Sequence, residues 1–396
     1  MSKQKKVAAL CLAFVLLLSA CGQKAELSVD SPRETTAAAT DKTIVNNVAD
    51  PAVLFSERDY ETAHSEDKAG KIQFNGTTIT GSTDAAKISD SKVEITEEGT
   101  YILSGTLENG QVVVNVEKTD KIQLVLNGAD ITSEESAAIY VLQADKVFIT
   151  TVKGTENVLK NGGTFEAIDD NNIDGAIFSK DDLTLNGEGK LYIESPAGHG
   201  IVCKDDLVVT CGEYVVSSAS QALNGKQSVR IAGGIFNLTA GKDGIHAEDN
   251  DDVRLGYGYI SGGVLAVTAS GDGIDANGTL EITGGHTAVC GPTQGDTAAL
   301  DYDKTAIISG GTFIGTGASG MAQTFSDLEN QGVIALQVGS AAANTAIILK
   351  DAAGKEIVNY APALGYNVVI ISTPDMAKGE TYTITVGSQS GEFTAS

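Results

Sequence analysis

The sequence predicts an all-β protein, in which a right-handed parallel β-helix is followed by a small C-terminal antiparallel β-domain. Three observations lead to this prediction. Short runs of β-branched and alternating residues are separated by Gly, Asn and Asp, which is the pattern of strands joined by turns. No stretch shows an extended helical period. Similar short units recur about every 22 residues, and a repeat of this size is typical of solenoids.

Residues 1–20 have the features of a lipoprotein signal peptide. A basic start with Lys3, Lys5 and Lys6 precedes the apolar run Val7–Leu18, which is too short to span a membrane, and a Leu-Ser-Ala-Cys motif ends at Cys21. This order looks like a bacterial lipobox, in which Cys21 becomes the lipidated first residue after cleavage. We therefore expect a protein held by its lipid anchor alone on the extracytoplasmic face of the cell membrane.

The charge balance excludes one large class of function. The chain has 27 Lys and Arg against 52 Asp and Glu, and removal of the three signal-peptide lysines leaves 24 against 52, a formal charge of −28. The basic residues are scattered singly, so nucleic-acid phosphates would repel this protein and nucleic-acid binding is not expected. Cys203, Cys211 and Cys290 are an odd number at no metal-like spacing, which favours buried thiols.

Composition divides the mature chain. Residues 21–70 are rich in Ala, Thr, Ser, Asp and Glu with little periodicity, which predicts a flexible linker between the lipid and the folded part. Residues 71–325 contain the strand pattern and are assigned to the β-helix. The first predicted strands are Ser91–Thr96, Gln111–Val116, Lys121–Leu126 and Lys146–Thr151.

Two parallel series of residues define the repeat. Six glycines recur with steps of 23, 22, 29, 22 and 26 residues, and five of the six residues that stand two positions later are large and apolar. The glycines are Gly189, Gly212, Gly234, Gly263, Gly285 and Gly311, and the residues two positions later are Leu191, Tyr214, Phe236, Leu265, Thr287 and Phe313. The second series, in which Gly or Ala precedes each member, is Ile139, Ile177, Ile201, Leu223, Ile245, Ile274 and Leu300.

A unit of about 22 residues holds three short strands and three turns. Such a unit buries a continuous core only if it stacks on its neighbours with like residues above like residues. This predicts the parallel β-helix, and a sandwich with coincidental glycines remains the alternative. The calcium-binding nonapeptide roll has a different period, and the Asn signature of leucine-rich repeats is absent.

The repeat stops after Gly320, and residues 326–396 are assigned to a small β-domain that caps the open end of the helix. Capping is expected because an unpaired strand edge invites aggregation. The predicted strands are Gly332–Val338, Thr345–Lys350, Ile357–Tyr360, Asn367–Ser372 and Thr381–Val386.

Five segments carry a resemblance to a known family. They are Ala176–Thr184, Gly200–Leu207, Asp243–His246, Asp272–Asp275 and Gly320–Gln323. In this order they resemble the carbohydrate-binding β-helix lipoproteins of clostridia and their relatives, and the likeness covers roughly residues 70 to 396. The resemblance implies a calcium-containing parallel β-helix that binds cellulose and acidic sugars such as polygalacturonate, without a known catalytic role.

The chain departs from the repeated Asp-Gly-Ile pattern of that family at two turns. These turns read Gln221-Ala222-Leu223 and Ala298-Ala299-Leu300. A metal site that needs an aspartate at either turn is therefore not implied there.

Aligned carboxylates indicate a site for Ca²⁺. On the second series, Asp243 and Asp272 occupy one position in neighbouring coils, and Asp275 and Asp301 occupy another. Paired strands lie about 4.8 Å apart, so these carboxylates would repel one another unless a cation lay between them. Calcium takes about 6 to 8 oxygen ligands, which stacked aspartates and turn carbonyls supply. A solvated acidic face is the alternative. The expected ligands are Asp243, Asp272, Asp275 and Asp301, with Asp249 and Asp251 from an acidic insertion.

Lysines suggest an enzyme as a second hypothesis. Lys180, Lys204 and Lys226 align in three consecutive coils, and a lysine beside calcium could remove the α-proton of a uronic acid in a β-elimination lyase. Flanking carboxylates would instead favour the charged ammonium, which is a poor base. A surface ladder of Lys and Asp is therefore expected rather than a catalytic base, and in such a ladder Lys180 and Lys204 could still bind a uronate carboxylate.

Other sugar contacts are expected from aromatic rings near the acidic insertion, namely Tyr257, Tyr259 and Tyr302, with loop packing as the alternative. His199 and His246 make only a weak case for a transition metal, since no Cys or Glu partner stands at a suitable spacing. We conclude that the sequence predicts a calcium-stabilised surface lipoprotein that binds polysaccharide without catalysis. A calcium-dependent polysaccharide lyase and a structural adhesin are the alternatives.

Overall fold

The computed structural model describes residues 54–166, 172–252, 254–292 and 295–396. The predicted signal peptide, Cys21 and most of the predicted linker lie outside these residues. The described part is almost entirely strand, as predicted, with one helical turn, α3 (Glu57–Tyr60). Within it, no helix has the length and hydropathy needed to cross a membrane.

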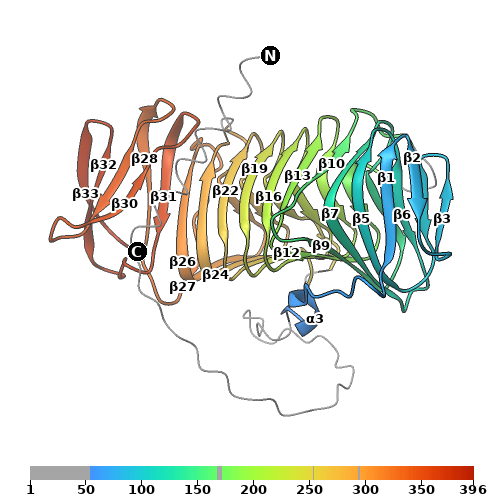
Figure 1. The fold of residues 1–396 in the computed structure, drawn as a ribbon. Coiled ribbons are helices and arrows are strands. Elements are labelled where there is room, and N and C mark those ends of the chain that lie inside the picture. The colour runs from blue at the N-terminus through green and yellow to red at the C-terminus, as the bar shows by residue number, and fades with distance from the viewer. Residues whose placement is uncertain (1–53, 167–171, 253, 293–294) are drawn as a thin grey trace, which may run out of the picture. The chain divides into compact units, whose positions relative to one another are not determined.

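The strands wind into coils, and each complete coil contributes one strand to each of three parallel ladders (Figure 1). The first ladder contains β5 (Gly99–Leu107), β7 (Lys121–Ser133), β9 (Lys146–Thr151), β12 (Asp182–Gly187), β15 (Asp206–Val209), β18 (Ser228–Ile231) and β21 (Tyr257–Ile260). The second ladder contains β10 (Glu156–Asn161), β13 (Lys190–Ser195), β16 (Glu213–Ser218), β19 (Ile235–Ala240) and β22 (Val264–Ala269). The long strands β5, β7, β24 (Thr279–Cys290) and β26 (Thr305–Gly317) run through both ladders.

The third ladder is a separate sheet that holds the remaining strand of each coil. Its members are β3 (Ala86–Ser89), β4 (Lys92–Ile95), β6 (Gln111–Asn115), β8 (Ile139–Gln143), β11 (Gly175–Ser179), β14 (His199–Cys203), β17 (Leu223–Gly225), β20 (Ile245–Ala247), β23 (Ile274–Ala276) and β25 (Leu300–Tyr302). All of its pairs are parallel except β3 with β4. The parallel β-helix predicted from the repeat is therefore confirmed.

Both predicted series of residues align in the observed register. Ile201 pairs with Leu223, which pairs with Ile245, and the same register continues to Leu300. In the second ladder Tyr214 pairs with Phe236, and their rings stack in the core with centroids 5.1 Å apart. Side chains of the same kind thus stack in successive coils. Together they form a continuous apolar core that is shielded from water.

The chain ends in antiparallel strands, as predicted. Strand β31 (Tyr366–Ser372) pairs antiparallel with β26 and with β28 (Val333–Ala341), and β27 (Asp327–Leu328) pairs with the other half of β26. These strands cover the edge of the last coil (Figure 1). A separate four-stranded sheet follows, made of β29 (Ile347–Lys350), β30 (Glu356–Tyr360), β32 (Thr381–Val386) and β33 (Gln389–Thr394).

The start of the described chain differs from the predicted linker. Strands β1 (Gly70–Gly76) and β2 (Thr78–Gly81) form a hairpin, and β1 pairs in parallel with β5. Residues 54–61 pack on the first ladder, with Leu54, Phe55 and Asp59 buried. The last part of the region predicted to be flexible is therefore held to the folded body.

The three cysteines of the described chain are free thiols. Cys203 and Cys290 are buried, and Cys211 is half-buried.

Candidate functional site

A column of polar side chains lies on the outer face of the third ladder. Ile245, Ile274 and Leu300 point into the core, so the residue after each points outward. These outward residues are His246, Asp275 and Asp301, which are direct register partners in consecutive coils. The preceding coil places Asn224 in the same column.

Two more aspartates lie two residues before the core positions. Asp243 Oδ1 accepts the backbone N–H of Asp272 at 2.8 Å, and Asp272 Oδ1 accepts that of Ala298 at 2.5 Å. Asp243 Oδ2 also accepts a hydrogen bond from the Gln221 side chain at 3.0 Å. The backbone of the next coil therefore fixes the direction of each carboxylate, and Oδ2 of Asp272 accepts no hydrogen bond from a described residue.

Burial and mutual repulsion act strongly on this group. Burial, together with the charges of Asp243, Asp272 and Asp301, raises the pKa of Asp275 to about 8. Burial is also the main reason why the pKa of Asp272 is raised to about 6, although the Ala298 N–H opposes the shift. Shifts of this direction mean that the folded protein lacks enough positive charge here to balance the ionised carboxylates.

His246 belongs to the same group. Its Nε2 lies 3.2 Å from Asp275 Oδ2, and ligand atoms of Asp243, His246 and Asp275 all lie within 4.8 Å of one another. Burial lowers the pKa of His246, so the ring does not supply a stable positive charge near neutral pH. The sequence analysis gave this histidine little weight as a metal ligand. It directly follows Ile245 of the second series, as Asp275 follows Ile274, and this spacing was the signal that the two side chains lie side by side.

The donor set fits a hard divalent cation. Asp243, Asp272, Asp275 and Asp301 come together from three consecutive coils and offer carboxylate oxygens, which calcium prefers. Asp301 Oδ1 also accepts a hydrogen bond from the side-chain amide of Gln323. A residue beyond the repeat thus helps to orient the Asp301 carboxylate.

The two aspartates of the acidic insertion do not join this group. Asp249 is buried, and its Oδ1 accepts the backbone N–H groups of Asp251 and Asp252 at 2.9 and 3.1 Å. This carboxylate therefore closes its own turn. The Asp251 side chain is exposed, and among the described residues neither aspartate belongs to a cluster of possible metal ligands.

The three predicted aromatic contacts lie in different surroundings. Tyr259 is only 2% exposed and packs against Phe55, with ring centroids 6.0 Å apart, so no sugar can stack on it in this arrangement and its prediction is corrected. Tyr257 is half-buried beneath the guanidinium of Arg230, which lies 5.5 Å from the ring centroid. Tyr302 packs against the core, and its hydroxyl donates to the Thr324 carbonyl at 2.8 Å.

The predicted lysines flank the polar column. Lys204 Nζ lies 3.9 Å from Glu248 Oε1 and 5.9 Å from the centroid of the Phe178 ring. Asn224 donates to the other oxygen of Glu248 at 2.6 Å. Lys180 is half-buried, and no carboxylate of the described residues lies within 4.0 Å of its ammonium. The structure thus brings Lys204, Asn224 and Glu248 together beside His246.

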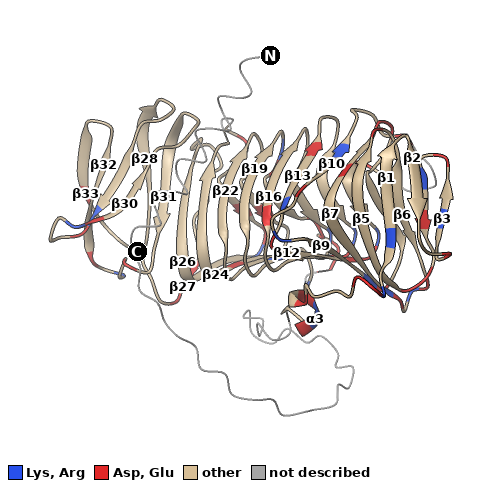
Figure 2. Ribbon diagram, in the orientation of Figure 1, with Lys and Arg blue, Asp and Glu red and all other residues tan. Residues whose placement is uncertain are grey.

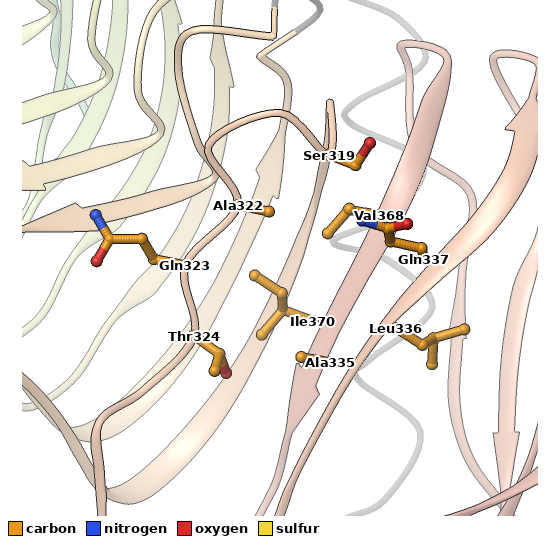
Figure 3. A pocket seen from close by; sticks show the side chains of 9 residues that line it. All are labelled: Ser319, Ala322, Gln323, Thr324, Ala335, Leu336, Gln337, Val368 and Ile370. Carbon is orange, nitrogen blue, oxygen red and sulfur yellow. The ribbon is translucent and has the colours of Figure 1, made fainter.

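A shallow pocket of about 170 Å³ lies at the end of the β-helix (Figure 3). It is lined by Ser319 and Ala322–Thr324 and by residues of β28 and β31, and its lining includes both polar and apolar side chains. In Figure 3 the Gln323 side chain points away from the other labelled side chains, and its amide donates a hydrogen bond to Asp301 Oδ1. Ligand sites usually enclose about 300 Å³ or more, so we assign no ligand to this pocket.

Comparison with known proteins identifies a family that the chain matches over much of its length. A family model described as carbohydrate-binding domain-containing protein matches residues 89–346. A protein of the same description from Acetivibrio thermocellus is 36% identical over 155 residues, which are 38% of this chain and 54% of that protein. The match thus spans about half of the relative's length.

A solved structure of a polysaccharide lyase-like protein from C. thermocellum, a gadolinium derivative, is also similar, with a TM-score of 0.53. It is 30% identical, and the alignment covers 66% of this chain and 99% of that chain. The family model matches more than half of the sequence, and the chain belongs to the family of carbohydrate-binding domain-containing proteins.

Proposed function

We propose that this protein is a surface lipoprotein that binds acidic polysaccharide through calcium held on the third ladder. The observation that carries the proposal is the set of half-buried carboxylates in successive coils, in which burial, followed by the charges of neighbouring carboxylates, raises the pKa values of Asp272 and Asp275. Asp243 and Asp275, whose ligand atoms lie with that of His246 within 4.8 Å of one another, would hold the ion, and the nearby carboxylates of Asp272 and Asp301 would add oxygen ligands.

Calcium would resolve a conflict of charge. With a formal charge of −28 after signal-peptide removal, the protein should repel a polymer of uronic acids. A bound divalent cation inverts the local sign and can share coordination positions with uronate oxygens. Lys204 beside Glu248, and half-buried Lys180, lie next to this column and would add contacts to the sugar carboxylates.

The comparisons support parts of this proposal. The family is described as carbohydrate-binding, and one similar structure is a gadolinium derivative of a polysaccharide lyase-like protein. Gadolinium is a hard cation which, like calcium, favours oxygen donors. Anchoring through Cys21 rests on the sequence alone, because this residue lies outside the described part of the chain.

A glycan-binding screen tests the proposal. The protein should bind polygalacturonate when calcium is present and release it when a chelator is added. Cellulose is included because the resemblance implies it, and its binding should not depend on calcium. If a calcium-loaded, folded protein binds no glycan of the panel, the structural adhesin becomes the better hypothesis.

A lyase is the second candidate function, favoured by the likeness to a lyase-like protein. Against it, the ammonium of Lys204 lies beside the carboxylate of Glu248, and an ammonium has no lone pair with which to take a proton. Incubation with polygalacturonate should therefore yield no unsaturated uronate over time. Product that accumulates in the wild type and is lost in Lys204→Ala would establish the lyase instead.

A further inference from the structure

Residues Leu54–Glu61, here called the N-terminal strap, lie across the outer face of the first ladder (Figure 1). Arg230 on β18 donates to the Leu54 carbonyl at 2.7 Å, and Thr210, directly after β15, donates to the Asp59 carbonyl at 2.8 Å. Asn186 on β12 donates to the same carbonyl at 3.0 Å. The strap is therefore bound by side chains from three successive coils.

One carboxylate of the strap occupies a site built for an anion. Asp59 Oδ1 lies 2.8 Å from Lys146 Nζ on β9 and accepts the Thr184 hydroxyl on β12 at 2.6 Å. Asp59 is buried and Lys146 is partly buried, with 3% of the Asp59 side chain and 13% of the Lys146 side chain exposed. Among the described residues, Asp59 is the only carboxylate within 4.0 Å of Lys146 Nζ.

The electrostatics agree with this geometry. Burial alone would raise the pKa of Asp59, but Lys146 and the hydroxyls of Thr184 and Ser56 outweigh it, so its pKa is lowered. The acidic residues of α3, which include Asp59, are visible in Figure 2. Arg230 pairs with Asp206 on the neighbouring strand, so Lys146 is the cation that the strap itself neutralises.

Aromatic rings flank the anion site. Phe148, two residues after Lys146 on β9, lies under the strap residue Arg58, whose guanidinium carbon is 4.5 Å from the ring centroid. Tyr259 on β21 packs against the strap residue Phe55. Removal of the strap would leave a flat sheet face with an ammonium, hydroxyl and amide donors and two ring faces.

We propose that this face is a second binding surface, that its ligand is a uronic acid oligomer, and that the strap competes for it with Asp59 in the place of a sugar carboxylate. A buried ion pair is weak evidence of a purely structural role, because its desolvation offsets most of its attraction and apolar packing would hold a strap as well. Ammonium and hydroxyl groups recognise a carboxylate, and ring faces stack on sugars. The inference rests on the proposed binding of acidic polysaccharide but uses a different face from the calcium column.

Competition makes a measurable prediction. The apparent dissociation constant for the ligand is the intrinsic constant divided by the fraction of molecules whose strap is open. A protein whose strap is held more weakly should therefore bind the ligand more tightly. In the full chain, Asp59→Ala removes the strap carboxylate that contacts Lys146 and Thr184. We expect its affinity for trigalacturonate, measured by calorimetry in chelator, to rise about tenfold over the wild type.

Three controls separate this effect from changes in net charge or folding. Glu57→Ala removes one exposed negative charge from the same helical turn and should leave the affinity unchanged. Adding Lys146→Ala to Asp59→Ala should abolish the gain, and neutral cellotriose should show no gain. Because chelator removes calcium-bridged binding, the result for the strap is independent of the result for the calcium column.

A second measurement uses the unaltered protein, so it does not depend on a variant that folds. Trigalacturonate should speed amide hydrogen exchange in residues 54–61 and leave exchange in β29–β33 unchanged. The proposal is overturned if Asp59→Ala binds no more tightly than Glu57→Ala, or if saturating ligand leaves exchange of the strap unaltered.

Discussion

At the scale of single residues, the partner of a buried carboxylate decides its behaviour. Asp59 and Asp275 are both largely buried aspartates on outer faces of the β-helix, but Asp59 meets an ammonium and Asp275 meets other carboxylates. The pKa of Asp59 is lowered, and that of Asp275 is raised to about 8. One environment is complete without a ligand, whereas the other would be completed by a cation.

Replacement of Asp275 tests this difference. Its folded-state pKa lies above the unfolded value, so its ionisation destabilises the fold as pH rises from about 4 to about 8 in the absence of a cation. In chelator at pH 8, Asp275→Asn should therefore melt at a higher temperature than the wild type. Calcium at a hundredfold excess over its dissociation constant should stabilise the wild type by about 2.7 kcal/mol and the variant far less. Equal responses to calcium would contradict the assignment of Asp275 as a ligand.

Glu281 gives a pH prediction away from the calcium column. This residue is 5% exposed on β24, and burial, followed by the charge of Glu329, raises its pKa from 4.5 to about 7. Stability that depends on its protonated form is present below pH 4.5 and is lost as pH rises through about 7. The full shift corresponds to about 3 kcal/mol, and solvent screening reduces it, so Glu281→Gln should be more stable than the wild type by about 2 kcal/mol above this window and nearly equal below it. Urea unfolding at both ends of the window measures the difference, and a constant difference would refute the shift.

Part of the candidate site could be predicted from the sequence, down to individual residues. Alignment on the second series put Asp243, Asp272, Asp275 and Asp301 at matching positions, because strand register follows directly from a repeat. It could not show that Tyr259 is covered, since the covering ring of Phe55 comes from a segment about two hundred residues earlier in the chain.

At the scale of elements, glycines allow the second-ladder strands to begin in register. Gly212, Gly234, Gly263, Gly285 and Gly311 all have positive φ, from 117° at Gly212 to 76° at Gly311. Glycine reaches this conformation without the steric cost of a side chain. The spacing of these residues was visible in the sequence because each coil needs the same turn.

A glycine substitution tests this role. At Gly263, with φ of 92°, an added Cβ would lie 2.8 Å from the Gly234 carbonyl oxygen of the preceding coil. Gly263→Ala should lower the free energy of unfolding by about 1 to 3 kcal/mol. Gly339→Ala is the matched control, because nothing lies within 4 Å of its added Cβ. Equal stabilities of the two variants in urea unfolding would argue against a constrained turn.

The N-terminal strap was missed because its composition resembles that of the linker before it. Only a few signals were available: apolar Leu54 and Phe55, and Ser56 three residues before Asp59, the spacing of a helix-capping pair. In the structure Asp59 Oδ2 accepts the Ser56 backbone N–H at 2.8 Å. A segment this short is held by contacts with distant strands, which local patterns do not encode.

At the scale of the whole molecule, the repeat made the fold class predictable. Strands of one coil bury their apolar residues only against the same positions of the next, so the period of the sequence is the period of the structure. The C-terminal strands were predicted from alternation alone, and β33 was missed because Gln389–Thr394 is mostly polar and has only partly buried or exposed residues. Its pairing with β32 at a sheet edge is decided by the turn between them.

The lipid anchor is also a property of the whole molecule. Cys21→Ala should release the protein from the membrane fraction or leave its precursor unprocessed, because the acylated cysteine is the expected attachment point. Fractionation and intact-mass measurement read both outcomes. A single acyl chain gives only marginal attachment, so the wild-type mass should show more than one chain. Unchanged mass and fractionation of the variant would refute lipidation.

In the proposed function, bound calcium links the carboxylates of the third ladder to the polysaccharide. The most direct measurement is retention of the protein by immobilised polygalacturonate, for wild type and Asp275→Asn, each with calcium and with chelator. The exposed-site variant Asp67→Asn serves as the control for loss of one negative charge. Wild type and Asp67→Asn should be retained much more strongly with calcium than with chelator, and Asp275→Asn should be retained no more strongly with calcium than with chelator. Equal retention of folded wild type with and without calcium, or a gain in the retention of Asp275→Asn with calcium as large as that of wild type, would contradict the calcium-bridged binding.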